Sequence, residues 1–261
     1  MSLFELARVY EALTTGIAFR SGQDANPGLS LISRIESADG DVIYEAKAGS
    51  RRLLDEKTAL AVSDILRNVV RFGTGRYAAD NIFLHSSDPV VEEQLAQLDL
   101  RVPVLGKTGT SNRFTNASFA GVVPEVRATG DGLTVGQKGF TVAAYVGFDD
   151  NRPMTRNSTR IAGSSGALPA WSKVAASVVL AKNYAGMLDV VDLAFSGQNE
   201  VPLVYPDLGQ VQVAVSDGNG GLPVSADNQQ KASVVTFGKF SAGGEVVAER
   251  SFRPFWRNSD Q

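Results

Sequence analysis

The stretch VPVLGKTGT at positions 102–110 joins an apolar run to a Lys-Thr-Gly triplet. Small and β-branched residues are typical of strands, so we expect a strand over positions 102–108. Two similar runs follow at positions 117–123 and 140–148. The centre of the fold is therefore predicted to be a group of three strands, with the Lys-Thr-Gly triplet in the first.

A β-hairpin is predicted before this group. The runs at positions 29–36 and 42–45 read as short strands around the turn sequence Ala38-Asp39-Gly40. We expect the hairpin and the three later strands to form one antiparallel sheet. After Val201, alternating valines again favour strands, which predicts a β-rich tail.

Apolar residues at helical spacing predict helices that pack on this sheet. They cover positions 4–18, positions 58–70 with Gly73 after the last turn, and positions 167–182. The predicted fold class is α+β. We place a domain boundary near Gly186, between a first domain at 1–186 and a β-rich C-terminal extension at 187–261.

Several other features are interpreted as structural. The polar and acidic segment 83–100 predicts a surface excursion with a short helix, and it contains the single histidine, His85. Adjacent carboxylates on a strand point to opposite faces, so Asp149-Asp150 indicates a turn or a salt bridge rather than a metal site. Phe72 and Tyr77 are expected in the core, and Trp171 is expected to pack the helix predicted at 167–182 on the sheet.

Composition excludes several classes of function. Apolar residues make up 43% and charged residues 20% of the 261 residues, which is typical of a globular protein. The net charge of −3 provides no basic stripe for nucleic acid. With no cysteine and one histidine, thiol nucleophiles, disulfides and Cys/His zinc sites are excluded. No apolar run approaches the about 18 residues of a membrane span, and the N-terminal residues do not predict a signal peptide.

The triplet at positions 106–108 also imitates the end of a nucleotide-binding phosphate loop, G-x-x-x-x-G-K-[ST]. That pattern requires a glycine at position 101, where this chain has Arg101. It also requires a flexible loop, whereas positions 102–105 are the apolar run VPVL. The nucleotide-binding interpretation is therefore rejected.

The alternative is serine acyl transfer, in which a Lys-Thr-Gly strand is the third of three motifs. A cation beside a serine stabilises the alkoxide, hydroxyl groups bind a substrate carboxylate, and glycine lets the substrate backbone lie close. An edge strand also binds extended peptides through main-chain hydrogen bonds. A single triplet is weak evidence, so its context decides.

That context resembles class A (bifunctional) penicillin-binding proteins, in the C-terminal part of their transpeptidase domain. Positions 66–75, LRNVVRFGTG, resemble the signature L-R-x-V-V-x-x-G-T-G, and positions 4–10, FELARVY, resemble the helix L-E-L-A-x-A-Y. The other segments that follow the family's order are 35–44, 107–112, 119–121 with Pro124, 145–154, and 163–169 with Trp171. Together they cover positions 4 to about 182, and they imply a partial penicillin-binding (β-lactamase-like) fold.

The resemblance implies roles for individual residues. Lys107 would lie beside the nucleophile and assist proton transfer. Thr108 and Thr110 would offer hydroxyls to the substrate carboxylate, and the Thr110 N–H would be an oxyanion donor. Gly109 would admit the substrate, and Ser111 is added to the substrate-binding set.

The chain lacks the two earlier motifs, because no serine is followed by lysine three positions on or by asparagine two positions on. We therefore expect a fragment that begins downstream of the nucleophile, with positions 1–3 as an added leader, and that is inactive alone. The family would supply an N-terminal membrane helix, a glycosyltransferase domain and a location at the outer face of the cytoplasmic membrane.

The implied reaction of the parent is D,D-transpeptidation of D-Ala-D-Ala stem peptides of peptidoglycan, with β-lactams as inhibitors and no metal or organic cofactor. Two alternatives stay open: a hydrolytic D,D-carboxypeptidase or β-lactamase-like relative, and a non-catalytic peptidoglycan-binding or scaffold module. The oligomeric state is not indicated by the sequence.

Three departures from the family point to a divergent subgroup. Positions 116–119 are Asn-Ala-Ser-Phe where the family has Asp-Ala-Trp-Phe, so Ser118 replaces a tryptophan. The loop 125–138 is longer than usual, and the stretch 81–100 is interpreted as an insertion. Each change would alter substrate choice.

Overall fold

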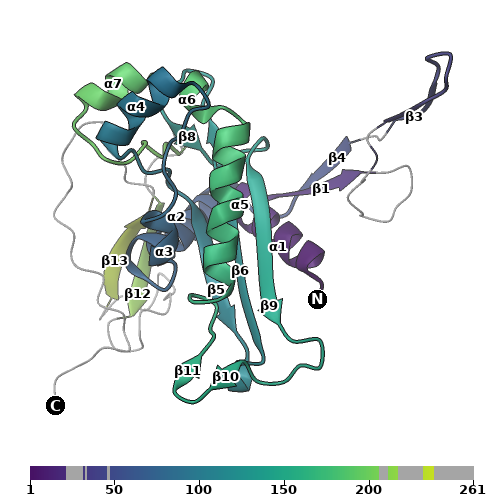
Figure 1. Ribbon diagram of the computed structural model, residues 1–261, viewed down its shortest axis with the longest axis vertical. Coiled ribbons are helices and arrows are strands. Elements are labelled where there is room, and N and C mark those ends of the chain that lie inside the picture. Colours follow the sequence, from purple (N-terminus) through teal and green to yellow (C-terminus); the bar gives the residue numbers. More distant parts are fainter. Residues whose placement is uncertain (22–31, 33, 46–47, 206–210, 217–231, 238–261) are drawn as a thin grey trace.

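A computed structural model describes residues 1–21, 32, 34–45, 48–205, 211–216 and 232–237 (Figure 1). Its helices are α1 (Leu3–Thr15), α2 (Glu56–Phe72), α3 (Arg76–Ala79), α4 (Pro89–Leu98), the 3-10 turn η1 (Asn112–Phe114), α5 (Ala167–Ala181), α6 (Tyr184–Met187) and α7 (Val190–Phe195). Its strands are β1 (Ile17–Ser21), β2 (Arg34–Glu36), β3 (Val42–Glu45), β4 (Ala48–Arg52), β5 (Leu105–Thr110), β6 (Asn116–Val123), β7 (Glu125–Val126), β8 (Leu133–Thr134), β9 (Phe140–Gly147), β10 (Thr155–Arg156), β11 (Thr159–Arg160), β12 (Val211–Ser216) and β13 (Ala232–Phe237).

The central sheet has three antiparallel strands in the order β5-β6-β9. In its register Thr108 on β5 lies opposite Phe119 on β6, and Phe119 lies opposite Ala144 on β9. The three strands predicted from the sequence are confirmed, with β5 starting and ending later than expected. Helices and antiparallel strands together make the fold class α+β, as predicted.

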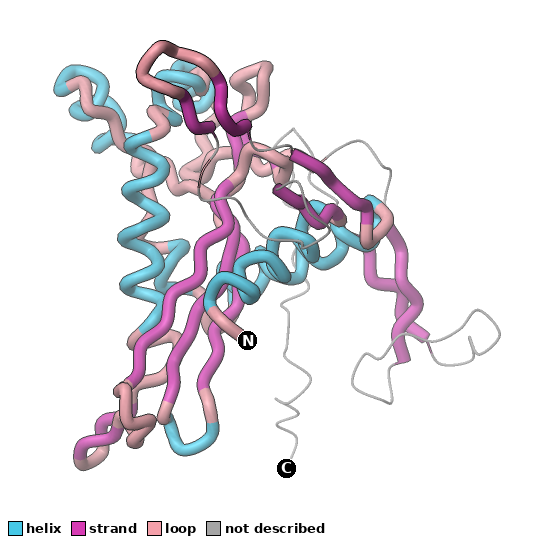
Figure 2. The backbone as a smooth tube through the Cα atoms, turned by 90° about the vertical axis from the view of Figure 1, so that its right-hand side faces the viewer, coloured by secondary structure: helices cyan, strands magenta, loops and turns pink. Residues whose placement is uncertain are grey.

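Helix α5 covers one face of this sheet and α1 lies on the opposite side (Figure 2). The side chain of Trp171 on α5 is completely buried, with its Nε1–H donating to the Val142 carbonyl at 2.9 Å. Its ring lies 4.8 Å from the Phe119 ring, centroid to centroid, in a tilted arrangement. Such aromatic pairs contribute both buried area and favourable geometry. The prediction that Trp171 packs this helix on the sheet is confirmed.

Helix α2 connects the N-terminal part to the sheet. Asp55 begins it, because its carboxylate accepts a hydrogen bond from the Thr58 N–H at 2.9 Å, and Gly73 ends it. Leu60, Leu66 and Val70 are buried on its inner face. The helix predicted over 58–70 is thus confirmed and is longer at both ends.

The hairpin does not join the central sheet, so that prediction is wrong. Among the described strands, β2 and β3 pair only with each other, and β1 pairs with β4 as a separate two-stranded ribbon. The pair β2–β3 projects away from the body (Figure 1). Ile43 on β3 is 68% exposed, so the apolar residues of the hairpin do not face the core. The first predicted helix ends earlier than expected, at Thr15, because Gly16 caps it in a left-handed conformation and β1 begins at Ile17.

Two other predictions need correction. Phe72 and Tyr77, expected in the core, are 46% and 43% exposed. Val70 faces the core, and Phe72 lies two positions further along α2, on the other side of the helix. The segment 83–100 contains the expected short helix α4, but Leu95 and Leu100 are buried in the core, so it is only partly a surface excursion.

The chain after α5 returns to the same core. Leu188, Leu193, Val201 and Leu203 are buried in the cluster that contains Trp171 and Phe119. Strands β12 and β13 form an antiparallel pair, as the sequence predicted for the tail. The segment 217–231 that links them lies outside the described residues. The boundary near Gly186 stays a prediction.

Candidate functional site

Strand β5 presents the Lys-Thr-Gly triplet on an edge. Among the strands that the structure describes, β5 pairs with β6 only. The Ser111 N–H, just beyond the strand, donates to the Asn116 carbonyl of β6 at 2.9 Å. Because main-chain direction alternates along an antiparallel ladder, the N–H and C=O groups of Thr108 and Thr110 face away from β6. No described strand pairs with this side of β5, so an extended ligand can approach it there.

Lys107 places its ammonium group at this edge. Its Nζ donates to the Thr108 carbonyl at 3.0 Å and to the Thr108 Oγ1 at 3.3 Å. The Lys107 side chain is exposed. A cation and a hydroxyl therefore lie side by side next to the outward main-chain groups of the strand, which is an arrangement suited to an anionic peptide end.

The hydroxyl of Thr108 has a second neighbour. Its Oγ1 lies 2.7 Å from the Oγ1 of Thr74, which belongs to the Gly73-Thr74-Gly75 turn after α2. The N–H groups of both glycines donate to the Val69 carbonyl at 3.0 Å, so the turn folds back on the last turn of the helix. Sequence reasoning quoted this Gly-Thr-Gly signature but assigned Thr74 no role.

The hydroxyl of Thr110, at the end of β5, is held by the loop before α5. Its Oγ1 accepts a hydrogen bond from the Gly163 N–H at 2.9 Å. A Cβ atom on Gly163 would lie 2.5 Å from the Gly109 carbonyl oxygen and 2.7 Å from that of Ser118. Only glycine allows the loop before α5 to approach β5 and β6 this closely.

Gly109 has a neighbour of its own. A Cβ atom on Gly109 would collide with Oγ of Ser118, which lies opposite on β6. Ser118 is the residue that stands where a tryptophan was expected from the resemblance. The absence of a side chain on Gly109 leaves this hydroxyl next to the strand, on the same face as Lys107.

Ser111, the last predicted substrate-binding residue, lies in the turn between β5 and β6. Its Oγ is 2.7 Å from the Thr115 Oγ1 and accepts a hydrogen bond from the Asn116 N–H at 2.8 Å. The structure thus brings Lys107, Thr108, Gly109 and Thr110 together on one edge. It places the Ser111 hydroxyl in the hydrogen bonds of the turn.

The residues interpreted as structural behave accordingly. Asp150 caps a turn by accepting from the Arg152 N–H at 3.2 Å, and it pairs with the Arg152 guanidinium at 3.8 Å. His85 Nδ1 lies 2.8 Å from the Glu92 carboxylate on an exposed part of the surface. The Ser86 N–H and then the His85 ring hold the pKa of Glu92 below its ordinary value. The proposed turn or salt-bridge role of the Asp149-Asp150 pair is confirmed.

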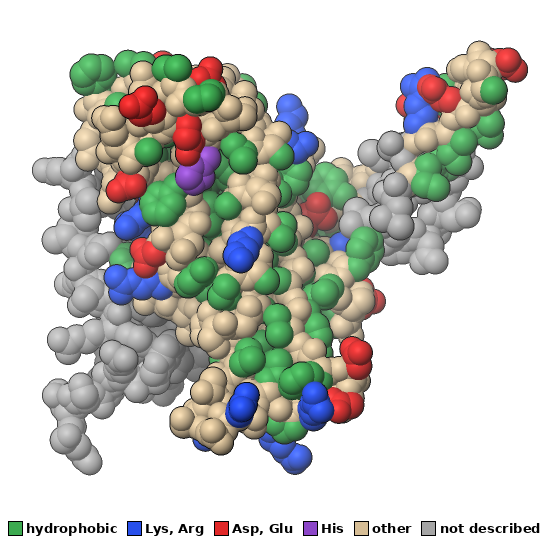
Figure 3. Space-filling model, in the orientation of Figure 1, with side chains coloured by type: hydrophobic (Ala, Val, Ile, Leu, Met, Phe, Trp, Pro, Cys, Tyr) green, Lys and Arg blue, Asp and Glu red, His purple; other side chains and the backbone are tan. Residues whose placement is uncertain are grey.

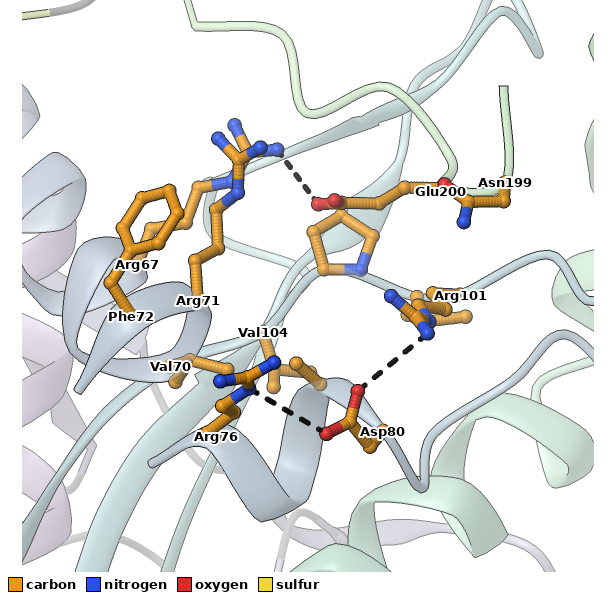
Figure 4. Close-up of a pocket in the computed structure, with 13 residues that line it drawn as sticks. Arg67, Val70, Arg71, Phe72, Arg76, Asp80, Arg101, Val104, Asn199 and Glu200 are labelled. Carbon is orange, nitrogen blue, oxygen red and sulfur yellow. Dashed lines mark hydrogen bonds and ion pairs between the residues drawn. The ribbon is translucent and has the colours of Figure 1, made fainter. Parts of the chain in front are cut away.

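A cavity of about 220 Å³ lies between α2, α3 and the segment that leads into β5, and the Lys-Thr-Gly triplet does not line it (Figure 4). It is lined by several arginines and two carboxylates. Arg67 pairs with Glu200 at 2.8 Å, while Asp80 is shared between Arg101 at 3.6 Å and Arg76 at 3.9 Å. These pairs join elements to one another, so we interpret the cavity as part of the structural framework.

Lysine and arginine side chains are scattered, and form no single basic patch, on the face that Figure 3 displays. Within the described residues, no cluster of three or more His, Asp or Glu side chains could hold a metal ion. None of the described helices combines the length and the apolar character that a membrane crossing requires.

Comparison with known proteins identifies relatives of one kind. The chain is 27% identical over 170 residues to penicillin-binding protein 1B of Vibrio cholerae serotype O1. The aligned region covers 65% of this chain and 16% of that protein. Penicillin-binding protein 1B of Escherichia coli K12 is 27% identical over 176 residues, or 66% of this chain and 15% of that protein. Penicillin-binding protein 1A of Clostridium tetani is 26% identical over 165 residues, or 62% of this chain and 17% of that protein.

Among solved structures, penicillin-binding protein 1A from Haemophilus influenzae matches 92% of this chain and 32% of that chain, with a TM-score of 0.49 and 19% identity. No protein-family model matches the chain. The chain spans about one sixth of the length of the curated relatives. The predicted resemblance to class A penicillin-binding proteins is confirmed over about two thirds of the chain.

Proposed function

Starting from the similarity to class A penicillin-binding proteins, we propose that this chain provides the Lys-Thr-Gly strand of a peptidoglycan D,D-transpeptidase. One observation carries the proposal. On the open edge of β5, the Lys107 ammonium, the Thr108 hydroxyl and the outward main-chain groups of Thr108 and Thr110 lie together. This edge suits an extended peptide that ends in a carboxylate.

Each residue of the strand has a role in this proposal. Lys107 lies beside the catalytic serine, stabilises negative charge there and assists proton transfer. Thr108 and Thr110 bind the terminal carboxylate of the D-Ala-D-Ala end through their hydroxyls. The Thr110 N–H, which points away from β6, is one oxyanion donor. Gly109 admits the peptide, and Ser111 supports the turn that ends the binding edge.

The reaction divides between this chain and the part of the protein that carries the nucleophile. The serine attacks the carbonyl of the penultimate D-Ala, releases the terminal D-Ala, and forms an acyl-enzyme that an amine of a neighbouring stem peptide resolves. No metal or organic cofactor takes part. We propose that the chain is inactive alone and that its parent, which also carries a glycosyltransferase domain, is anchored at the outer face of the cytoplasmic membrane.

Intact-mass analysis after benzylpenicillin treatment tests the proposal, since β-lactams acylate the same serine. The chain should stay unmodified, the full-length parent should gain one adduct, and Lys107→Ala in the parent should abolish it. Lys173→Ala, at an exposed lysine on α5, is the matched control and should keep the adduct. An adduct on the chain alone would mean that the nucleophile is misassigned.

The same experiment separates the alternatives. A folded parent that gains no adduct would favour the non-catalytic binding module. If the adduct forms, incubating the parent with a stem peptide and an amine acceptor distinguishes the two enzymes. A cross-linked product supports the transpeptidase, whereas free acid alone supports the hydrolase.

A further inference from the structure

The Thr108 hydroxyl lies between two groups, the Thr74 hydroxyl at 2.7 Å and the Lys107 ammonium at 3.3 Å. An ammonium group can only donate, and a hydroxyl has one proton and two acceptor sites. With Lys107 donating to one acceptor site, Thr74 can donate to the other. The proton of Thr108 is then free to donate to a third group.

The turn that carries Thr74 is held in place by its glycines. A Cβ atom on Gly73 would lie 2.9 Å from the Val69 carbonyl oxygen, and one on Gly75 would lie 3.1 Å from the Val70 Cα. A side chain at Gly73 would collide with the Val69 carbonyl, and one at Gly75 would be tightly packed against Val70. The two glycines therefore favour a turn that keeps the Thr74 hydroxyl within hydrogen-bond distance of β5.

We propose that Thr74 is a positioning residue that donates to Thr108 and thereby aims the Thr108 proton at the carboxylate of the bound ligand. This inference rests on the proposed function, in which Thr108 binds that carboxylate. It extends the site from β5 to the turn after α2. Thr74 acts through Thr108 and makes no contact with the reacting atoms.

The test is the rate of acylation of the full-length parent by two ligands that differ in one group. Benzylpenicillin has the carboxylate, and its methyl ester lacks it. In Thr74→Val, which keeps the shape and loses the hydroxyl, the second-order rate constant with benzylpenicillin should fall by about tenfold, the effect of losing one hydrogen bond of about 1.4 kcal/mol. With the methyl ester it should fall by less than about twofold.

Three variants control this result. Thr74→Ser keeps the hydroxyl and should restore the wild-type rate. Thr129→Val removes a threonine hydroxyl that is bonded to Asp131, in the loop between β7 and β8, and should leave both rates unchanged. In the double variant Thr74→Val/Thr108→Val, the loss should be no larger than in Thr108→Val alone, because Thr74 acts through Thr108.

The outcomes separate two failures. If Thr74→Val slows both ligands equally, Thr74 has a merely structural role and the inference is wrong. If it slows neither ligand, the inference is also wrong, while the proposed function stands. If the wild-type parent is not acylated by either ligand, the proposed function fails and this inference fails with it.

Discussion

Arg67 on α2 and Glu200, 133 positions later, form an ion pair in which Nη2 and Oε1 are 2.8 Å apart. The Arg67 side chain is only 6% exposed and that of Glu200 is 25% exposed. Next to this pair, the Arg101 N–H donates to the Asn199 carbonyl and the Val201 N–H donates to the Arg101 carbonyl. The segment after α7 is thus joined both to α2 and to the chain that leads into β5.

Glu200→Gln should destabilise the protein by about 2 kcal/mol, because it leaves the buried Arg67 guanidinium beside a neutral group. The effect is smaller than that for a fully buried pair, since Glu200 keeps some contact with solvent. Urea unfolding of the purified chain measures it. The matched control is Glu36→Gln, which weakens the Arg34–Glu36 pair.

That control pair is shorter, at 2.6 Å, but both of its side chains are 48% exposed. Its loss should cost less than about 0.5 kcal/mol. The two variants therefore distinguish burial from distance as the factor that determines how much an ion pair contributes to stability. Equal losses in the two variants would contradict the structural role assigned to Arg67 and Glu200.

Gly163→Ala should be strongly destabilising, by about 2–3 kcal/mol, because the new methyl group would meet main-chain carbonyl oxygens of β5 and β6. Main-chain atoms in a sheet cannot move aside without breaking strand pairing. The melting temperature followed by circular dichroism measures the loss.

Gly109→Ala provides the contrast. Its methyl group would meet the Ser118 hydroxyl, which is the end of a side chain and can rotate away. Its cost should be smaller, and Ser118→Ala in the same protein should remove most of it. A Gly163→Ala protein as stable as wild type would mean that the loop before α5 is not held against the strands in this way.

The strands of the central sheet could be predicted because they are rich in β-branched and small residues, which favour extended backbone. Phe119 and Trp171 lie on strongly apolar segments, and their packing follows from that pattern. The candidate edge was located by its motif, and Lys107 to Thr110 do lie on one strand. The motif predicts the order of these residues along the strand. It does not predict which residues from other parts of the chain contact them, such as Thr74 and Gly163.

The wrong predictions have a common cause. Ile43 and Phe72 are apolar, but tertiary structure decides whether an apolar residue meets a partner, and here both are exposed. Leu95 is buried inside a segment whose composition is polar. The contact between Thr74 and Thr108 joins positions 34 apart and could not be read from spacing. Its only signal was the pair of glycines on either side of Thr74.

Tyr184 gives a prediction for alkaline pH. Its hydroxyl donates to the Pro124 carbonyl at 2.6 Å, and the side chain is only 2% exposed. Burial, with a smaller contribution from the Glu125 carboxylate, raises the pKa of Tyr184 from 10.0 to about 12. The unfolded chain loses this proton first, so the stabilisation from neutral Tyr184 is fully present below pH 10 and is lost as the pH rises through about 12.

Tyr184→Phe should therefore be less stable than wild type by about 1 kcal/mol at pH 8, because the buried Pro124 carbonyl loses its donor. Above pH 10 the difference should shrink, since only wild type loses stability through this phenol. Urea unfolding of both proteins between pH 8 and pH 11.5 gives the two curves, and groups that both proteins share cancel in the difference. Tyr77→Phe, at an exposed tyrosine, controls for the substitution itself. Curves for wild type and Tyr184→Phe that stay parallel over this range would show that the Tyr184 hydroxyl is not buried against Pro124.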